Sequence, residues 1–349
     1  MPHPFSTFYA GKRVLVTGHT GFPGGWTAAW LKYLGAQVYG YGLPPASRPN
    51  LFDATLLDRG MTSIFGDVRD RKSLTNVFAE FQPEIVIHCA SRSNPQLAEL
   101  EPVETFSTNI MGTVFVLEEA RLSDSVRSVV HATSATENEG EASGEEIDIH
   151  EASMACSNLA RSAFTNSFLH ATKTGAATAR LAEVIGGGDW RPGRIVPNLV
   201  RSLMCGEPVK VDGQHLRIWH VLESTHASLL LAQKLFEYGQ QYSATWDFGP
   251  AEPSSMSAAK FANLFVELWD APDTYKAPEA EKILPALDNN AAEQGLGSLN
   301  FLSAQQAIAW TVEWYRAFYA DSASVWRVTE DQIERYMQLT RECERIAQR

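Results

Sequence analysis

The sequence predicts an α/β fold built on a doubly wound parallel sheet, with a smaller C-terminal α/β lobe. Short apolar runs alternate with longer amphipathic runs through the first half of the chain. A glycine-rich turn follows the first apolar run, and helical runs punctuated by proline and glycine fill the last third. Strands that alternate with helices form parallel sheets covered on both faces, because each crossover helix packs back onto the sheet.

The first strand and the turn after it form the most informative segment. Residues 14–16 are apolar, Gly18, Gly21 and Gly24 follow in the pattern GxxGxxG, and a helical pattern then runs to Gly35. Glycines allow the backbone to turn tightly and to approach a pyrophosphate, whose charge is stabilised by the amides at the helix N-terminus. Strand, glycine turn and helix together predict a Rossmann-type sheet that binds a dinucleotide.

The strand pattern then repeats along the chain. Further strands are predicted at residues 37–41, 61–65, 84–88 and 128–133. Long helical patterns cover residues 103–121 and 153–173. A last helix is expected to start at Thr329 as its N-cap, because Glu330 and Asp331 would complement the helix dipole. The ligand of such a sheet binds at the carboxyl ends of its strands.

One feature of the dinucleotide motif is missing. An acidic residue that binds the adenosine ribose is expected about 20 residues after the glycines, but residues 40–43 read Gly-Tyr-Gly-Leu. The nearest charged residues downstream, Arg48 and Asp53, lie too far along an irregular segment to take this role. The motif alone therefore does not choose between NAD and NADP.

Composition limits the class of protein. The 349 residues are enough for one large domain or two closely joined ones. The apolar runs are far shorter than the ~18 residues that span a bilayer, and the N-terminus lacks the apolar stretch of a signal peptide, so a cytoplasmic protein is expected. A net charge of −12 argues against nucleic acid. The cysteines lack metal-ligand spacing, so reduced thiols and no metal site are expected; they are Cys89, Cys156, Cys205 and Cys343.

A series of motifs along nearly the whole chain carries a family resemblance. The motifs are GHTGFPGGW, GDVRD, VIHCAS, EPVETFSTNIMGTVFVLEEAR, ARLAEVIGGGDW, RIVPNLVRSLMCGEPV, RIWHVLES and WDFGP. On these the chain resembles the CDP-glucose 4,6-dehydratases of the extended short-chain dehydrogenase/reductase superfamily. The resemblance implies an NAD-binding domain at residues 1–182 and about 217–249. It implies a nucleotide-sugar-binding lobe at about 183–216 and 250–349.

The resemblance implies which residues would bind the cofactor. They are Gly18, Gly21, Phe22, Gly24, Asp67, Val68, Ala90 and Asn109. The glycines would hold the pyrophosphate of NAD, and Asp67 and Val68 would meet the adenine. Ala90 would line the nicotinamide side, and Asn109 would hold the backbone. NADP is not excluded.

The resemblance also implies a nucleotide-diphosphate sugar as substrate, with a CDP-hexose favoured. Its nucleotide and diphosphate would lie near Glu183, Arg194, Asn198 and Arg217. Arginine suits this role because its planar fork can donate two hydrogen bonds to phosphate oxygens. A surface salt bridge is the other interpretation of Arg217. Glu183 stands where the family usually has asparagine, and a carboxylate repels a diphosphate unless it is protonated or paired with a cation such as Arg194.

The resemblance exposes a first departure after the fifth strand. Dehydratases of this family carry the sequence TSDK at this point, and here it reads TSAT. Thr133 and Ser134 remain and are the expected catalytic residues. Ala135 and Thr136 replace the acid and the lysine that would assist the loss of water.

The second departure concerns the motif YxxxK on the next helix. In the family the tyrosine takes the proton of the sugar hydroxyl, and the lysine lowers the tyrosine's pKa and holds the nicotinamide ribose. Alignment puts Met154 and Asn158 at these positions. No tyrosine lies between positions 41 and 238 and no lysine between 72 and 173, so no shift of register restores the motif. Taken alone, Met154 is interpreted as a core side chain and Asn158 as a helix-surface amide.

Other residues could supply a proton-transfer group. The segment 137–151 could bring Glu137, Glu139 or His150 to the site, although a solvated acidic loop is the simpler interpretation. Further candidates are His88, His131 and His220. His88 and His131 stand within apolar strands, where satisfied core histidines are the default.

Two functions remain open at this point. The first is a nucleotide-sugar-modifying enzyme that uses bound NAD with altered proton-transfer groups. The second is a non-catalytic homologue that binds a nucleotide or nucleotide sugar, or pairs with an active relative. The resemblance further implies a homodimer through the two long helices at residues 103–121 and 153–173, in a twofold four-helix bundle.

Overall fold

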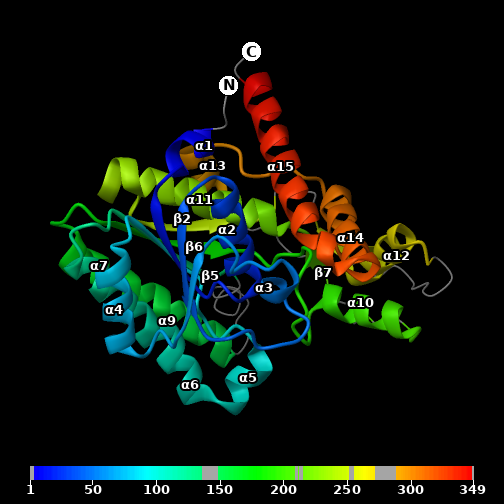
Figure 1. Cartoon of the computed structure of the whole chain (residues 1–349), viewed down its shortest axis with the longest axis horizontal. Helices are drawn as coiled ribbons and strands as arrows, with labels where there is room; N and C mark the ends of the chain where they lie inside the picture. Colours follow the sequence, from blue (N-terminus) through cyan, green and yellow to red (C-terminus); the bar gives the residue numbers. More distant parts are fainter. Residues whose placement is uncertain are drawn as a thin grey trace.

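A seven-stranded parallel sheet forms the centre of the computed structural model, in the strand order β3-β2-β1-β4-β5-β6-β8 (Figure 1). The strands are β1 (Arg13–Thr17), β2 (Gln37–Gly42), β3 (Thr62–Phe65), β4 (Ile85–His88), β5 (Ser128–Ser134), β6 (Gly175–Leu181) and β8 (Thr245–Phe248). Every pair of neighbours is parallel. The structure describes residues 4–135, 148–208, 211, 215–250, 255–271 and 288–347. The predicted doubly wound α/β fold and its first five strands are confirmed.

The central strands are apolar on both faces, as parallel strands covered by helices must be. On β1, Leu15 packs into one core, while Val14 and Val16 pack into the other. β4 alternates in the same way, with Val86 on the side of Leu15 and Ile85 on the opposite side. This double burial explains why the strands read as unbroken apolar runs rather than as an alternating pattern.

Helices cover both faces of the sheet (Figure 1). On one face lie α4 (Arg71–Phe81), α7 (Gly112–Leu122) and α9 (Ile149–Phe164). On the other lie α2 (Phe22–Tyr33) and α11 (Val221–Tyr238), which pack against each other and against the central strands. The sheet is therefore wound in both directions from β1, and the turns after β1, β4 and β5 meet at its carboxyl edge.

The two long predicted helices are present, with different limits. The first runs as α6 (Pro102–Phe106), a π-helical turn η1 (Ser107–Met111) and α7. The second, α9, begins four residues before the predicted start, because the Asp148 side chain caps it by accepting a hydrogen bond from the Glu151 N–H at 2.7 Å. It gives way to the π-helical turn η3 (Thr165–Leu169) before the predicted end.

The remaining helices and the ribbon complete the described chain. The helices are α1 (Pro4–Tyr9), α3 (Leu51–Ala54), α5 (Pro95–Leu100), α10 (Ile195–Cys205), α12 (Ala258–Trp269), α13 (Asn290–Leu296), α14 (Ala304–Ala320) and α15 (Val325–Ala347), with 3-10 turns η4 (Gly239–Tyr242) and η5 (Ser322–Ser324). A separate antiparallel ribbon joins β7 (His215–Arg217) to β9 (Ser255–Ser257). No helix among the described residues is long and apolar enough to cross a membrane. The four cysteines are unpaired thiols.

The predicted start of the last helix at Thr329 is wrong. Helix α15 begins at Val325, directly after the turn η5, and Thr329 lies one turn inside it. The Thr329 hydroxyl donates to the Val325 carbonyl at 2.9 Å and accepts from the indole N–H of Trp314 at 2.9 Å. Its side chain therefore joins α15 to α14 instead of capping a helix end.

The segment after β6 is fastened to the rest of the structure by backbone hydrogen bonds. The Ile185 N–H donates to the Trp219 carbonyl at 2.9 Å, and the Val221 N–H donates back to the Ile185 carbonyl at 2.8 Å. The indole N–H of Trp26 on α2 donates to the Gly187 carbonyl at 2.9 Å. These bonds hold the segment beside the N-terminal half of α2, close to the glycine turn.

A buried carboxylate links α11 to the loop before α14. Glu223 accepts the backbone N–H groups of Phe301 at 2.7 Å and Leu302 at 2.9 Å. Burial raises its pKa from 4.5 to about 7, against the lowering effect of these hydrogen bonds. Since the pKa is higher in the folded state, this group's contribution to stability is largest below pH 4.5 and is lost as the pH rises to about 7.

We therefore expect Glu223→Gln to flatten the pH dependence of stability. Between pH 4.5 and about 7 the wild type should lose about 1.4 kcal/mol of unfolding free energy per pH unit relative to the variant. Urea unfolding at a series of pH values measures the difference, with Glu267→Gln on the exposed surface of α12 as the control. If the difference in unfolding free energy between wild type and Glu223→Gln does not change with pH, the raised pKa of Glu223 is contradicted.

Candidate cofactor and substrate site

The glycine turn lies against the end of β4. Gly18 has a φ of +72°, and a side-chain carbon there would lie 2.8 Å from the backbone of Ala90. A side chain at Gly24 would collide with the carbonyl of Gly18. Gly21 is the N-cap of α2. The turn is therefore a close crossing of two backbone segments that only glycine permits.

The N-terminus of α2 fits an anionic group. Its N-cap makes no side-chain hydrogen bond, and its first turn holds no acidic residue. The first N–H groups of a helix have no partners within the helix, and they favour a negative charge. The guanidinium carbon of Arg191 lies 5.6 Å from the ring centroid of Phe22, at the start of α2. The same guanidinium donates hydrogen bonds to both carboxylate oxygens of Asp189. The turn can accordingly hold a pyrophosphate.

Asp67 and Val68 lie just after β3, as the sequence places them. The Asp67 carboxylate accepts the backbone N–H of Arg69 at 2.8 Å and its guanidinium at 2.7 Å, and the hydrogen bond to this guanidinium lowers the carboxyl pKa. The Tyr41 hydroxyl donates to the Asp67 carbonyl at 2.9 Å. Val68 is buried beneath this loop, against Gly112.

A string of buried polar side chains crosses the sheet beneath the site. The Thr113 hydroxyl donates to the Asn109 carbonyl at 2.6 Å, so its oxygen accepts from Nε2 of His88 at 3.2 Å and of His131 at 3.3 Å. Nδ1 of His88 then accepts from the Thr17 hydroxyl at 2.6 Å. Burial lowers the pKa of His88 to about 4 and lowers that of His131 as well, so both rings are neutral.

His88 is therefore a satisfied core histidine, as expected. His131 differs, because its Nδ1 has no hydrogen-bond partner among the residues described. The same holds for Nε2 of His220, which is fully buried beside Trp26 and Trp310.

Asn109 joins the loop after β4 to the start of α9. Its side-chain oxygen accepts the Arg92 N–H at 2.8 Å, and its amide donates to the Ser153 hydroxyl at 2.7 Å. That hydroxyl donates to the His150 carbonyl at 2.7 Å. The Asn109 side chain therefore bonds the backbone at Arg92 and a side-chain hydroxyl at Ser153.

The residues at the expected catalytic positions are apolar or neutral. Met154 is 3% exposed, Ala135 is buried beside the end of β5, and the Thr133 hydroxyl is buried with no partner among the described residues. Ser134 ends β5 and is half-buried. A thioether and a methyl group exchange no protons. The predicted residues Thr136, Glu137 and Glu139 lie outside the described residues.

Asn158 is not the helix-surface amide that its type suggests. Its side-chain oxygen accepts from the Thr245 hydroxyl at 3.0 Å and from the Arg161 guanidinium at 3.3 Å. Arg161 was missed in the sequence, although residues 150, 154, 157 and 161 share the helical spacing of one buried face. That spacing was the available signal.

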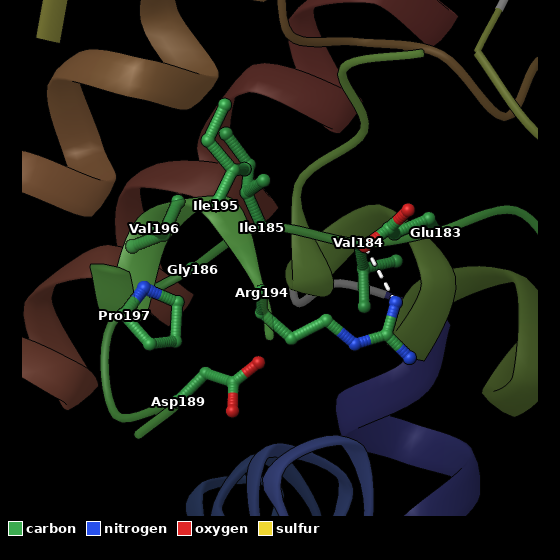
Figure 2. A pocket seen from close by; sticks show the side chains of 9 residues that line it. All are labelled: Glu183, Val184, Ile185, Gly186, Asp189, Arg194, Ile195, Val196 and Pro197. Atoms are coloured by element: carbon green, nitrogen blue, oxygen red, sulfur yellow. Dashed lines mark hydrogen bonds and ion pairs between the residues drawn. The ribbon is translucent and has the colours of Figure 1, made fainter. Parts of the chain in front are cut away.

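On the substrate side, Arg194 and Glu183 form an ion pair with 2.5 Å between Nη1 and Oε1 (Figure 2). They line a small, partly open hollow of about 10 Å³, together with Ile185 and Pro197. The Glu183 side chain is 47% exposed. Of the two alternatives expected for Glu183, protonation or pairing with a cation, the structure shows the ion pair.

His150 lies at the start of α9, one turn before Met154, and is buried. Burial lowers its pKa, and the positive charge of Arg194 lowers it further. Its Nε2 has no partner among the described residues.

Asn198 and Arg217 do not line this hollow. Asn198 lies in α10, one turn after Arg194, and Arg217 ends β7 just before Trp219. Within the described part of the chain, no cluster of His, Cys, Asp and Glu is arranged to hold a metal ion.

Comparison with known proteins identifies the family. Residues 14–243 match the NAD dependent epimerase/dehydratase family. The chain belongs to this family. It is 36% identical over 324 residues to the CDP-glucose 4,6-dehydratase of Salmonella typhimurium, a match that covers 88% of each protein. The motif resemblance in the sequence is confirmed by this match.

Solved structures share the fold at low identity. The UDP-glucose 4-epimerase of Thermotoga maritima with UDP-glucose superposes with a TM-score of 0.73 at 19% identity, over 88% of this chain and 99% of that one. A Bordetella bronchiseptica enzyme in complex with NAD⁺ and UDP gives a TM-score of 0.72 at 16% identity, over 93% and 98%. Both show that the chain shares this fold.

The close crossing at Gly18 can be tested against a matched glycine. Gly35 has a similar φ of +76°, but a side chain there would meet nothing within 4 Å. Gly35→Ala should therefore cost only the left-handed backbone strain, roughly 1–2 kcal/mol. Gly18→Ala should cost clearly more, since the backbone of Ala90 must also move. Urea unfolding of both variants measures this, and equal losses would be inconsistent with the crossing.

Proposed function

We propose that the protein binds NAD and a nucleotide-diphosphate hexose, with a CDP-hexose favoured, and that it does not act as an ordinary 4,6-dehydratase. One observation carries this proposal. At the two positions that the family gives to the tyrosine and the lysine, the chain has a buried thioether and an amide bonded to Arg161. The 36% identity to a CDP-glucose 4,6-dehydratase supports the choice of substrate class.

The residues present fit one half of NAD well. Gly18, Gly21 and Gly24 would hold the pyrophosphate at the N-terminus of α2, and Asp67 would face the adenine with its carboxylate kept charged by Arg69. When bound, NAD supplies a hydride acceptor. The nicotinamide half would lie near Ala90 and would lack the family's lysine, so binding should depend mainly on the adenosine and pyrophosphate half.

The substrate side would take the diphosphate at Arg194. Glu183 already occupies part of the guanidinium fork, so an incoming diphosphate must displace its carboxylate. The exposure of Glu183 allows the carboxylate to turn into solvent, where a charged group is well hydrated. Arg217 and Asn198 remain proposed contacts of the nucleotide sugar.

The remaining chemistry falls to the hydroxyls at the end of β5. Thr133 and Ser134 can form hydrogen bonds to a sugar hydroxyl, but neither hydroxyl is a base near pH 7. Loss of a general base costs roughly 10²–10⁴-fold in rate. Ala135 can also supply no proton for the loss of water. We therefore expect the protein to bind the sugar without dehydrating it at an ordinary rate.

We expect turnover of CDP-glucose below 1 s⁻¹, whereas a typical enzyme reaches about 10 s⁻¹. The assay follows formation of the 4-keto-6-deoxy sugar from CDP-glucose with NAD present, by chromatography and mass spectrometry. Faster turnover would contradict the proposal and point to an unassigned base. The first variants to test would then be His150→Gln, Glu137→Gln and Glu139→Gln.

A non-catalytic homologue is the second candidate. The same observation favours it, because the anion-binding turn and Arg194 are kept while the proton-transfer positions are changed. Such a protein would bind a nucleotide sugar, or pair with an active relative, without changing the sugar. Prolonged incubation with CDP-glucose separates the two: any altered sugar supports an enzyme, and none supports the homologue.

We also propose a homodimer through α6, η1, α7 and α9. Apolar side chains line an exposed hollow on the first of these helical segments: Val103, Phe106, Ile110 and Met111, with Pro102 and Ser107. Val103 is 76% exposed, and Leu159 on α9 is 69% exposed. A twofold axis would bury the same surface on both copies.

Light scattering at micromolar concentration should give twice the 38.5 kDa chain mass. Leu159→Glu should shift the protein to monomer, because a charge would be buried at the twofold contact. Ile346→Glu, at an exposed position near the end of α15, is the control and should remain dimeric. A monomeric wild type would rule out this assembly.

A further inference from the structure

Helix α9 carries a second cation position, one turn beyond the one the family uses. Arg161 follows Asn158 by three residues and is 3% exposed. A guanidinium is always charged in proteins, so it is buried only where polar partners surround it. The side chain therefore belongs to the interior next to the site and not to the solvent-facing side of the helix.

The guanidinium of Arg161 is held by the two outer strands of the sheet. Its Nε donates to the Thr178 hydroxyl on β6 at 2.8 Å, and its Nη2 donates to the Thr245 hydroxyl on β8 at 2.8 Å. Thr178 is fully buried. The guanidinium of Arg161 therefore points toward the sheet.

Asn158 belongs to the same hydrogen-bonded group as Arg161 and Thr245. Its side-chain oxygen accepts from Thr245, which itself accepts from Arg161, and it accepts from Arg161 directly. Residue 158 thus presents an acceptor to the guanidinium. A lysine there would set an ammonium, which only donates, beside a second positive charge in a poorly solvated place.

His131 shows that the guanidinium already acts on its surroundings. The positive charge of Arg161 contributes to lowering the pKa of His131, after burial and the effect of His88. A second cation at position 158 would lie close to this guanidinium.

We propose that Arg161 sets the charge of the nicotinamide side of the site, because it requires a neutral acceptor at position 158 and so excludes the family's lysine. This inference rests on the proposed binding of NAD. Arg161 is a positioning residue that acts through Asn158. Asn158→Lys alone cannot restore the family's site, whereas Asn158→Lys with Arg161→Ser can.

A double-mutant cycle on thermal stability tests the coupling without any cofactor. Asn158→Lys should lower the melting temperature by several degrees when Arg161 is present. In the Arg161→Ser background the same change should cost little or raise the melting temperature, because the ammonium can then donate to Thr178 and Thr245. Asn166→Lys, which adds a lysine on the exposed side of the same helical run, is the control and should show no coupling to Arg161.

Calorimetry with NAD and with ADP gives the second readout. ADP reports the adenosine and pyrophosphate half alone. Asn158→Lys should leave the dissociation constant for NAD within threefold of wild type. The double variant should bind NAD at least tenfold more tightly than Arg161→Ser, with ADP affinity unchanged in all four proteins.

Two results would overturn the inference: an unchanged melting temperature in Asn158→Lys, or tenfold tighter NAD binding by that single variant. Should Arg161→Ser fail to fold, Arg161→Gln keeps a donor for the two threonines and replaces it in the cycle. A wild type that binds neither ADP nor NAD would refute the proposed function, while the melting temperatures would still decide whether Arg161 excludes a cation at 158.

Discussion

The close crossing of Gly18 over the backbone of Ala90 is the constraint on which the site depends. It brings the turn after β1 against the end of β4, and it leaves no room for a side chain. The helix α2 starts from this turn, and the Thr17 hydroxyl just before it bonds His88 on β4. Because these contacts lie in the most buried strands of the sheet, the N-terminal end of α2 has a fixed place relative to the loop after β4.

The opposite side of the site is built from different chemistry. There the Met154 side chain is buried, and the Asn158 side-chain oxygen accepts a hydrogen bond from the buried guanidinium of Arg161. The guanidinium of Arg161 donates hydrogen bonds to the hydroxyls of Thr178 and Thr245, so these donors are directed into the fold. On the substrate side Glu183 likewise neutralises Arg194. The glycine turn is therefore kept, while Arg161 and Arg194 are both bonded to other side chains of the protein.

Much of the fold could be predicted because strands and glycine turns are local signals. Apolar runs of β1 and β4 and the spacing of the glycines depend on neighbouring residues only, and they gave the sheet correctly. The start of α15 was mistaken, because Thr329 has the residue type of a cap but bonds Trp314 on another helix. The limits of α9 were shifted, since its cap Asp148 stands in an acidic segment that resembles a loop.

The site was predicted where a motif marks it and missed where contacts are distant in sequence. The ion pair of Glu183 with Arg194 joins two residues eleven positions apart, and it was one of the two alternatives that the sequence left open for Glu183. Arg161 and Thr245 are 84 positions apart, and Glu223 and Leu302 are 79 apart, so neither contact leaves a local pattern. The spacing of buried residues on α9 was the one trace of Arg161.

Native mass spectrometry of the wild-type protein with NAD and CDP-glucose separates binding from dehydration, because it weighs the bound ligands themselves. We expect a complex in which each chain holds one NAD and one sugar nucleotide of unchanged mass. A bound sugar nucleotide lighter by one water would show that dehydration occurs without the tyrosine and the lysine. Absence of both ligands would contradict the proposed binding altogether.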